Sequence, residues 1–189
     1  MSNVKEQRAA KPGDTFILLV PPAQELHHLE KLQLGFQNQY SGKIVDHIHI
    51  TCERFTPKRE KFPQECSAVL RHHIGNLTPF TVFSDAVIQF YAPYWQNQVL
   101  RWRIEETAAW IEFRNLLRKT LEGIACPSHF DRQRRATCSI LTLDKAAELG
   151  EKHDLVIHSQ KLFTAQEAVI SQLHENHQFE ILETIPFSG

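Results

Sequence analysis

The sequence predicts a bilobal α+β fold, in which two similar β-α-β units face each other across a central cleft. Short segments alternate apolar and polar residues, which is typical of half-buried strands. Other segments carry apolar residues at helical spacing. The order of these strand-like and helix-like segments then repeats along the chain. A repeat of this kind predicts two lobes related by a pseudo-twofold axis, with one central strand of each lobe lining the cleft.

Length and composition fit one domain. The chain has 189 residues, of which 42% are hydrophobic and 23% are charged, and this is enough to bury a core. We expect a flexible tail over 1–13, which is polar and lacks the apolar stretch of a signal peptide, and a single bilobal domain over 14–189. The formal net charge of −1 gives no overall field toward nucleic acid or membrane. No apolar run reaches membrane-spanning length, and we expect a monomer.

The first half of the chain predicts three strands separated by two helices. An apolar run closes at Pro21-Pro22, which indicates a buried strand followed by the start of a helix. Apolar residues recur at helical spacing until Ser41-Gly42, and a second helical run ends at Gly75-Asn76, where glycine favours a helix end. In order, the expected elements are 15–20, 23–39, 45–55, 60–74 and 80–91.

The second half repeats this order and adds a last strand. The longest helix carries apolar residues on one stripe and ends at Gly123. A strand stub at Leu155-Val156-Ile157 is left open. We expect two antiparallel-type sheets that flank the cleft. The expected elements are a strand at 99–104, a helix at 106–123, a strand at 134–143, a helix at 144–152, and strands at 163–172 and 178–187.

The strand expected at 45–55 is the centre of the first unit. Its alternation puts Val45, His47, His49, Thr51 and Glu53 on one face. Two imidazoles and a hydroxyl in alternate positions suit a phosphate bound in a cleft. The pattern alone favours a solvated face in a chain with 11 histidines, so the functional interpretation needs the context of the whole chain.

In that context the chain resembles the two-histidine phosphoesterase superfamily, the group of LigT-like 2′-5′ RNA ligases and RNA cyclic phosphodiesterases. The resemblance rests on His49-Ile50-Thr51 in a His-Ile-Thr-x-x-Arg-Phe setting, on the duplicated order from 15 to 187, on the strand beginning Val99-Leu100-Arg101-Trp102, and on the C-terminal segment from Phe163 to Phe187. It implies a small bilobal protein with two His-x-Thr/Ser motifs facing across a cleft. Such proteins act on 2′,3′-cyclic phosphates or related 2′-5′ linkages, without a metal or other cofactor.

The resemblance implies catalytic roles for His49, Thr51 and Thr137. One histidine of the pair removes a proton and the other donates one, while threonines donate hydrogen bonds to phosphate oxygens. The second motif departs from the pattern, because neither possible register, Arg135-x-Thr137 or Thr137-x-Ser139, contains a histidine. Arginine binds phosphate but does not transfer protons near neutral pH.

The implied phosphate-binding residues are therefore Arg135, His47 and Ser139, with His47 also open as a neighbour that shapes the pocket. Two functions remain open. One is a cyclic phosphodiesterase of reduced activity, acting on an RNA end or a small cyclic nucleotide. The other is an impaired relative that binds a nucleotide or RNA phosphate end without turnover, and a purely structural role is less favoured. His47 and His129 are the candidates for a missing proton transfer.

The four cysteines carry no metal-binding spacing. We expect Cys52, Cys66, Cys126 and Cys138 to be reduced, which predicts a cytoplasmic protein. No other cluster resembles a ligand set, so we expect no metal.

Overall fold

The α+β class is confirmed, since in the described part of the chain three helices pack on a nine-stranded antiparallel sheet. The computed structural model describes residues 10–57, 62–92, 96–124, 126, 128–130, 133–144, 154–175 and 178–189. The helices are α1 (Ala23–Gln37), α2 (Phe62–Ile74) and α3 (Ala108–Gly123). The strands are β1 (Thr15–Leu19), β2 (Gly42–Ile44), β3 (Ile50–Phe55), β4 (Phe80–Ala92), β5 (Asn97–Ile104), β6 (Thr137–Leu143), β7 (Asp154–Ala165), β8 (Glu167–Leu173) and β9 (Phe179–Pro186).

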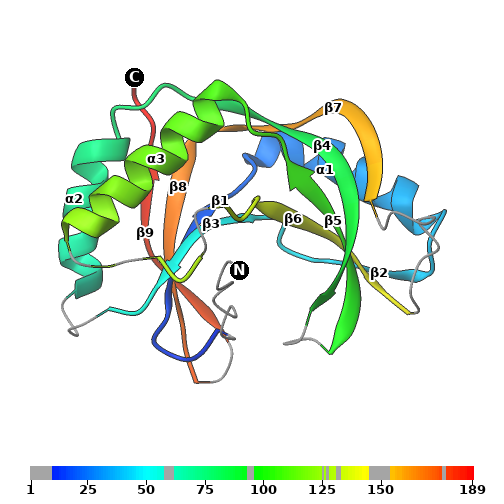
Figure 1. Ribbon diagram of the computed structural model, residues 1–189, viewed down its shortest axis with the longest axis horizontal. Helices are drawn as coiled ribbons and strands as arrows, with labels where there is room; N and C mark the ends of the chain where they lie inside the picture. The colour runs from blue at the N-terminus through cyan, green and yellow to red at the C-terminus, as the bar shows by residue number, and fades with distance from the viewer. Residues whose placement is uncertain are drawn as a thin grey trace, which may run out of the picture.

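The described strands form one hydrogen-bonded sheet in the order β7-β4-β5-β6-β3-β1-β8-β9, with β2 paired to β6 (Figure 1). The prediction of two sheets is therefore wrong, because the described strands all belong to one sheet. The two halves are joined where β3 and β6 pair through Ile50 and Cys138. Outward from this pair lie β6, β5, β4 and β7 on one side, and β3, β1, β8 and β9 on the other.

The helices lie at opposite ends of this sheet. Figure 1 shows α2 and α3 together at one end and α1 at the other. Phe36 of α1 meets Trp102 of β5 edge to face, with 6.2 Å between ring centres. Phe113 of α3 meets Phe80 of β4 at 5.5 Å and Phe187 at 6.0 Å. Buried aromatic pairs of this kind fix the helices on the sheet because they combine large buried area with preferred ring geometry.

The predicted strand 45–55 is interrupted by a bend between β2 and β3. His47 at this bend has a positive φ of 58°, which breaks the regular alternation of a strand. Gln33 of α1 holds the bend, since its side-chain amide donates to the carbonyl oxygens of Val45 at 3.1 Å and Ile140 at 3.2 Å. The amide of Val45 donates to the same oxygen of Ile140 at 3.0 Å. Sequence periodicity missed the bend because these contacts join residues far apart in the chain.

Other differences concern element boundaries. The strand expected at 163–172 is two strands, β7 and β8, separated at Gln166. The stub left open at Leu155-Val156-Ile157 is part of β7. Strand β6 begins at Thr137, so Arg135 precedes it. The helix expected at 144–152 lies outside the described residues except for Asp144. Residues 1–9 of the tail predicted over 1–13 also lie outside them.

Candidate functional site

The site is built on three adjacent strands, β3, β6 and β5, with His49 directly before β3. Ile50 and Cys138 are cross-strand partners, so the residues on either side of them also lie opposite each other, His49 with Ser139 and Thr51 with Thr137. On the next strand, Arg101 is the partner of Ser139. Alternate residues share a face of a sheet. An imidazole, a guanidinium and three hydroxyls therefore lie on one face of the sheet.

The intervening residues support this assignment of faces. Ile50, Cys138 and Trp102 are buried in the hydrophobic core. His49, Thr51, Thr137, Ser139 and Arg101 are all partly exposed. The polar residues therefore lie on the face that solvent reaches.

His49 has a defined tautomer. Its Nδ1 lies 2.7 Å from the carbonyl oxygen of His47. A carbonyl only accepts hydrogen bonds, so Nδ1 carries the proton and Nε2 of the neutral ring is left as the acceptor. Burial lowers the pKa of His49, the hydrogen bond to His47 opposes this, and the positive charge of Arg101 lowers the pKa further. At pH 7 the ring is neutral and its Nε2 is able to take up a proton.

Arg101 and the hydroxyls are the groups of the site that suit an anion. Arg101 Nη1 lies 3.4 Å from Thr137 Oγ1, to which it donates. Within the described part of the chain, no hydrogen bond engages the hydroxyls of Thr51 and Ser139. Hydroxyl donors beside a guanidinium are well suited to phosphate oxygens.

The pairing of β3 with β6 distinguishes the two registers of the second motif. A twofold axis through the Ile50–Cys138 pair exchanges His49 with Thr137 and Thr51 with Ser139. The geometry thus favours Thr137-x-Ser139, with Thr137 in the position of the second histidine. The roles predicted for these residues stay predictions, and the geometry brings four of them, His49, Thr51, Thr137 and Ser139, to one place.

Arg135 is held in a different set of contacts. Its Nη2 donates to Asp85 Oδ2 at 2.6 Å and to the carbonyl oxygen of Ile104 at 2.8 Å. Asp85 also accepts from Arg103 at 2.8 Å. Burial on its own raises the pKa of Asp85, but hydrogen bonds from Arg103 and Arg135 outweigh it and hold the pKa below its usual value. The predicted phosphate contact of Arg135 stays a prediction and competes with these bonds.

The alternation predicted through His47 and Glu53 is wrong, since the backbone departs from a regular strand at both. His47 is exposed at the bend and contributes its carbonyl oxygen to His49. Beyond Thr51 the pairing with β1 shifts by one residue, which marks a bulge. Glu53 is fully buried and accepts from Arg118 Nε of α3 at 2.7 Å.

His129 lies well away from His49. Its backbone amide donates to the carbonyl oxygen of Arg54, which is about 16 Å from His49 along β3 at ~3.3 Å per residue. Thr56 donates its hydroxyl hydrogen to Asp14, so Nε2 of His129, at 2.8 Å from that hydroxyl, is the donor to it. This geometry therefore does not favour His129 as the missing second proton-transfer group beside His49.

The sequence did not single out two arginines that lie near the site. Arg101 is brought beside Thr137 by the pairing of β5 with β6. Arg134 stacks on Phe130, with 3.9 Å from its Cζ to the ring centre. Burial lowers the pKa of Arg134 to about 10, and the charges of Arg101 and Arg54 add to this effect. Only the order of strands reveals this convergence of positive charge, because the local sequence of Arg101 does not record that β5 lies next to β6.

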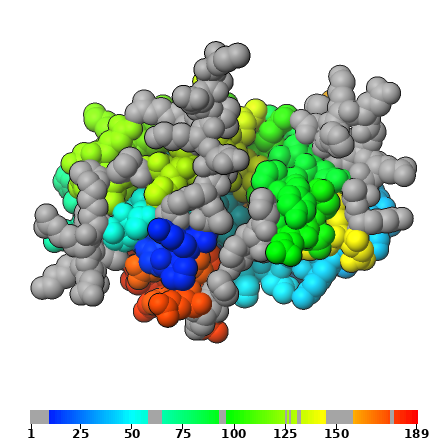
Figure 2. Space-filling view, turned by 60° about the horizontal axis from the view of Figure 1, so that its bottom comes forward, coloured from blue at the N-terminus to red at the C-terminus, as the bar shows by residue number. Residues whose placement is uncertain are grey.

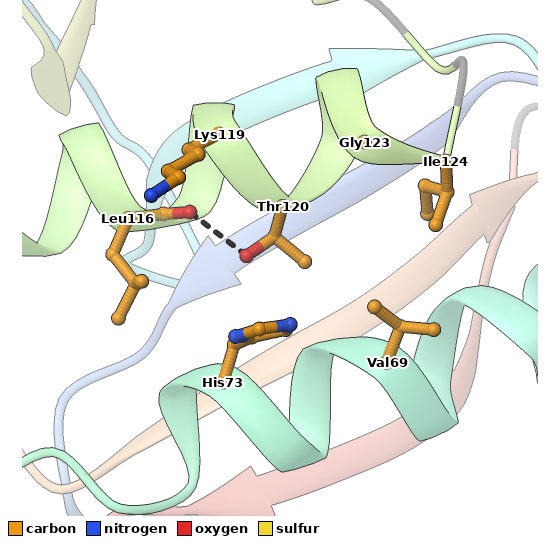
Figure 3. A pocket seen from close by; sticks show the side chains of 7 residues that line it. All are labelled: Val69, His73, Leu116, Lys119, Thr120, Gly123 and Ile124. Atoms are coloured by element: carbon orange, nitrogen blue, oxygen red, sulfur yellow. Dashed lines mark hydrogen bonds between the residues drawn. The ribbon is translucent and has the colours of Figure 1, made fainter.

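A separate cavity lies between α2 and α3 (Figure 3). It has a volume of about 320 Å³ and contains none of the residues described above. In Figure 3, His73 points across it toward Thr120, whose hydroxyl donates to the carbonyl oxygen of Leu116 at 2.9 Å. The lining is completed by Val69, Lys119, Gly123 and Ile124.

Among the described residues, no group of three or more histidine, cysteine or acidic side chains is placed to hold a metal ion. In the same part of the chain, no helix is long and apolar enough to cross a membrane.

Comparisons with known proteins identify the fold of the chain among solved structures. No family model matches the chain, and no curated protein matches it by sequence. Solved structures match over nearly the whole chain. LigT of E. coli in its apo form has a TM-score of 0.64 at 13% identity, covering 95% of this chain and 100% of LigT. The protein TT0787 of Thermus thermophilus has a TM-score of 0.63 at 16% identity, covering 93% of this chain and 98% of that protein.

A viral domain shares the same architecture. The PDE domain of MHV ns2 has a TM-score of 0.55 at 14% identity, covering 84% of this chain and 99% of that domain. The chain therefore has the fold of LigT and of the MHV ns2 PDE domain. The predicted resemblance to LigT-like proteins is confirmed at the level of the fold.

Proposed function

We propose that the chain is a member of the two-histidine phosphoesterase superfamily that binds the phosphate of an RNA end or a small cyclic nucleotide. Its phosphodiesterase-type activity is hydrolysis of a 2′,3′-cyclic phosphate at a reduced rate. The observation that carries the proposal is the meeting of His49, Arg101 and three hydroxyls on one sheet face, fixed by the Ile50–Cys138 pair.

Phosphate binding rests on the hydroxyls and on Arg101. Thr51 and Ser139 donate to phosphate oxygens, and Arg101 supplies a charge-assisted hydrogen bond beside Thr137. Structures of LigT, which shares the fold, contain phosphate, 3′-AMP, NADP+ or ATP. These ligands all carry phosphate, which supports the same class of ligand here.

Proton transfer rests on His49 alone. The neutral ring takes a proton from the attacking water through Nε2, while Nδ1 stays bound to the carbonyl of His47. The departing ribose oxygen then needs a proton, and Thr137 stands where the second histidine would supply it. A threonine hydroxyl does not ionise near neutral pH, so we expect the loss of one general acid–base step, which is worth roughly 10²–10⁴-fold in rate.

Binding without turnover is the second candidate. It is favoured by the same observation, Thr137 at the position of the missing histidine, together with the cation at Arg101.

The strand order also supports the predicted duplication, because equivalent strands of the two units lie at equal distances from the β3–β6 pair. A monomeric state and a cytoplasmic location stay predictions.

Turnover of 2′,3′-cyclic AMP and affinity for 3′-AMP test the proposal. The variants are His49→Ala and, as the control, His72→Ala, which removes an exposed histidine of α2. We expect slow turnover in the parent, loss of turnover in His49→Ala and no change in His72→Ala, with 3′-AMP bound by all three. Binding without turnover in the parent would select the second candidate. Turnover that survives His49→Ala, or absence of both binding and turnover, would overturn the site.

A further inference from the structure

We infer that Phe90 and Arg101 form a platform for the nucleobase, next to the phosphate site. The inference rests on the proposed function, because it specifies the ligand further, as a nucleotide whose base stacks on the protein. It assigns a role to an exposed aromatic residue that the phosphate chemistry leaves unexplained.

The register of the β4–β5 hairpin places Phe90 on the site face. Phe90 is the cross-strand partner of Val99, which lies two residues before Arg101 on β5. Residues two apart on a strand share a face. Phe90 therefore points to the same side of the sheet as Arg101 and Ser139.

Arg101 connects the aromatic ring to the phosphate site. Its Cζ lies 5.0 Å from the centre of the Phe90 ring. Its Nη1 lies 3.4 Å from Thr137 Oγ1. One side chain thus contacts both the hydroxyl of Thr137 and the ring of Phe90, so a ligand bound at the hydroxyls has an aromatic ring next to it.

Phe90 remains open to solvent, with 44% of its surface exposed. Single exposed hydrophobic residues are common and need no explanation by themselves. Phe90 differs because the cation on its ring also contacts the candidate site. In Figure 2 part of the hairpin of β4 and β5 is visible as a green surface. A base has a π face that stacks on aromatic rings and on guanidinium planes.

A second pair of phenylalanine and arginine is less suited to a base. Phe130 already carries two guanidinium groups, with Arg134 Cζ at 3.9 Å and Arg54 Cζ at 5.6 Å from its ring centre. Arg54 is buried and forms an ion pair with Asp14. Phe130 is therefore occupied by the protein itself, whereas Phe90 presents an exposed ring.

The chain supplies a matched control. Tyr91 is 52% exposed and directly follows Phe90, but it is the partner of Gln98 and so belongs to the opposite face of the hairpin. Removing either ring costs little core packing. An effect confined to Phe90→Ala is then an effect of position and not of lost surface aromatic area.

The experiment measures the affinity of the full chain for 3′-AMP and for inorganic phosphate. We expect the parent to bind 3′-AMP more tightly than phosphate. Phe90→Ala should lower the affinity for 3′-AMP by roughly tenfold or more, the size of one base-stacking contact, and leave that for phosphate unchanged. Phe90→Trp should restore 3′-AMP binding, and Tyr91→Ala should match the parent for both ligands.

The outcomes separate this inference from the proposed function. Equal 3′-AMP affinity in parent and Phe90→Ala overturns the platform, and so does an equal loss for both ligands, which would mean that Phe90 acts only by positioning Arg101. Phosphate binding with no gain from the adenosine group overturns the platform alone. Failure of the parent to bind either ligand overturns both proposals. If Phe90→Ala has a lowered melting temperature, Phe90→Trp against Tyr91→Trp gives the same comparison.

Discussion

His49 and Ser139 lie opposite each other across the joint between β3 and β6, one residue from the Ile50–Cys138 pair. The same pair puts Thr137 opposite Thr51. The two halves of the sheet therefore meet in an unequal site, with an imidazole on one strand and a threonine hydroxyl at the corresponding place on the other. This inequality sets the expected behaviour of the protein.

Introducing the missing imidazole should raise activity. We expect Thr137→His to increase turnover of 2′,3′-cyclic AMP by roughly 10²-fold or more, since it supplies a second proton-transfer group. Affinity for phosphate should fall, because the substitution removes the hydroxyl that accepts from Arg101. Steady-state kinetics of the parent and the variant measure both changes.

The control for this variant is Arg135→His, which follows the alternative register. It places an imidazole beside Asp85 and the carbonyl oxygen of Ile104 instead of at the Thr137 position. We expect no gain in turnover. A larger gain from Arg135→His than from Thr137→His would show that the register favoured by the β3–β6 pairing is the wrong one.

The two candidate cations should differ in their effect on phosphate. Arg101→Gln removes the guanidinium beside Thr137, and we expect it to weaken phosphate binding by about tenfold or more, as for one charge-assisted hydrogen bond. Arg135→Gln should change phosphate affinity little and lower stability instead, since it breaks the ion pair with Asp85. Titration calorimetry and urea denaturation of both variants distinguish the roles. Equal losses of phosphate affinity in the two variants would support the predicted contact between Arg135 and phosphate.

Removal of the Arg101 charge should also be visible at His49. The positive charge of Arg101 helps to lower the pKa of this imidazole, so Arg101→Gln should raise it. An NMR titration of the His49 ring protons in parent and variant measures the shift. An unchanged or lower pKa in the variant would contradict this electrostatic effect of Arg101 on His49.

Protein stability should decrease with falling pH through the ionisation of His49. The pKa of this group is lower in the folded protein than its ordinary 6.5, so the unfolded chain binds the proton more readily. The contribution is therefore complete above pH 6.5 and is lost as pH falls toward the folded pKa. Denaturant unfolding of the parent and of His49→Gln at pH 8 and pH 5.5 measures it. The variant should show the smaller decrease, and an equal decrease would argue against the lowered pKa.

The buried thiols should lower the stability of the protein in the alkaline range. Burial raises the pKa of Cys66 and of Cys138 from the ordinary 9.0 to about 12. Below pH 9 both states keep these protons, and above it the unfolded chain loses them first, so stability should fall between pH 9 and 12. Unfolding measured at pH 8 and pH 10 checks the decline. It should be shallower when both cysteines are replaced by alanine.

Activity should not depend on a divalent ion. The proposed steps use only His49, the hydroxyls and Arg101, so a chelator should leave the turnover of 2′,3′-cyclic AMP unchanged. The measurement compares rates before and after chelation and after addition of Mg²⁺, Mn²⁺ or Zn²⁺. Loss with the chelator and recovery with one ion would replace this mechanism with a metal-dependent one.

Local sequence patterns were sufficient for most of the fold. Helices α1, α2 and α3 follow the spacing of apolar residues, and β1, β4, β5 and β9 fall close to their expected ranges. These elements are predictable because burial of one face imposes a period that neighbouring residues record. The same reasoning found His49 and Thr51, which lie beside apolar residues that alternate with them.

The tertiary structure decided the rest of the site. The bend at His47 depends on Gln33, a residue of α1, and the choice of Thr137 over Arg135 depends on which residue of β6 pairs with Ile50. Arg101 joins the site only because β5 lies next to β6. Each of these facts is a contact between segments distant in the chain. Strand pairing and helix packing fix such contacts, and no periodicity within one segment records them.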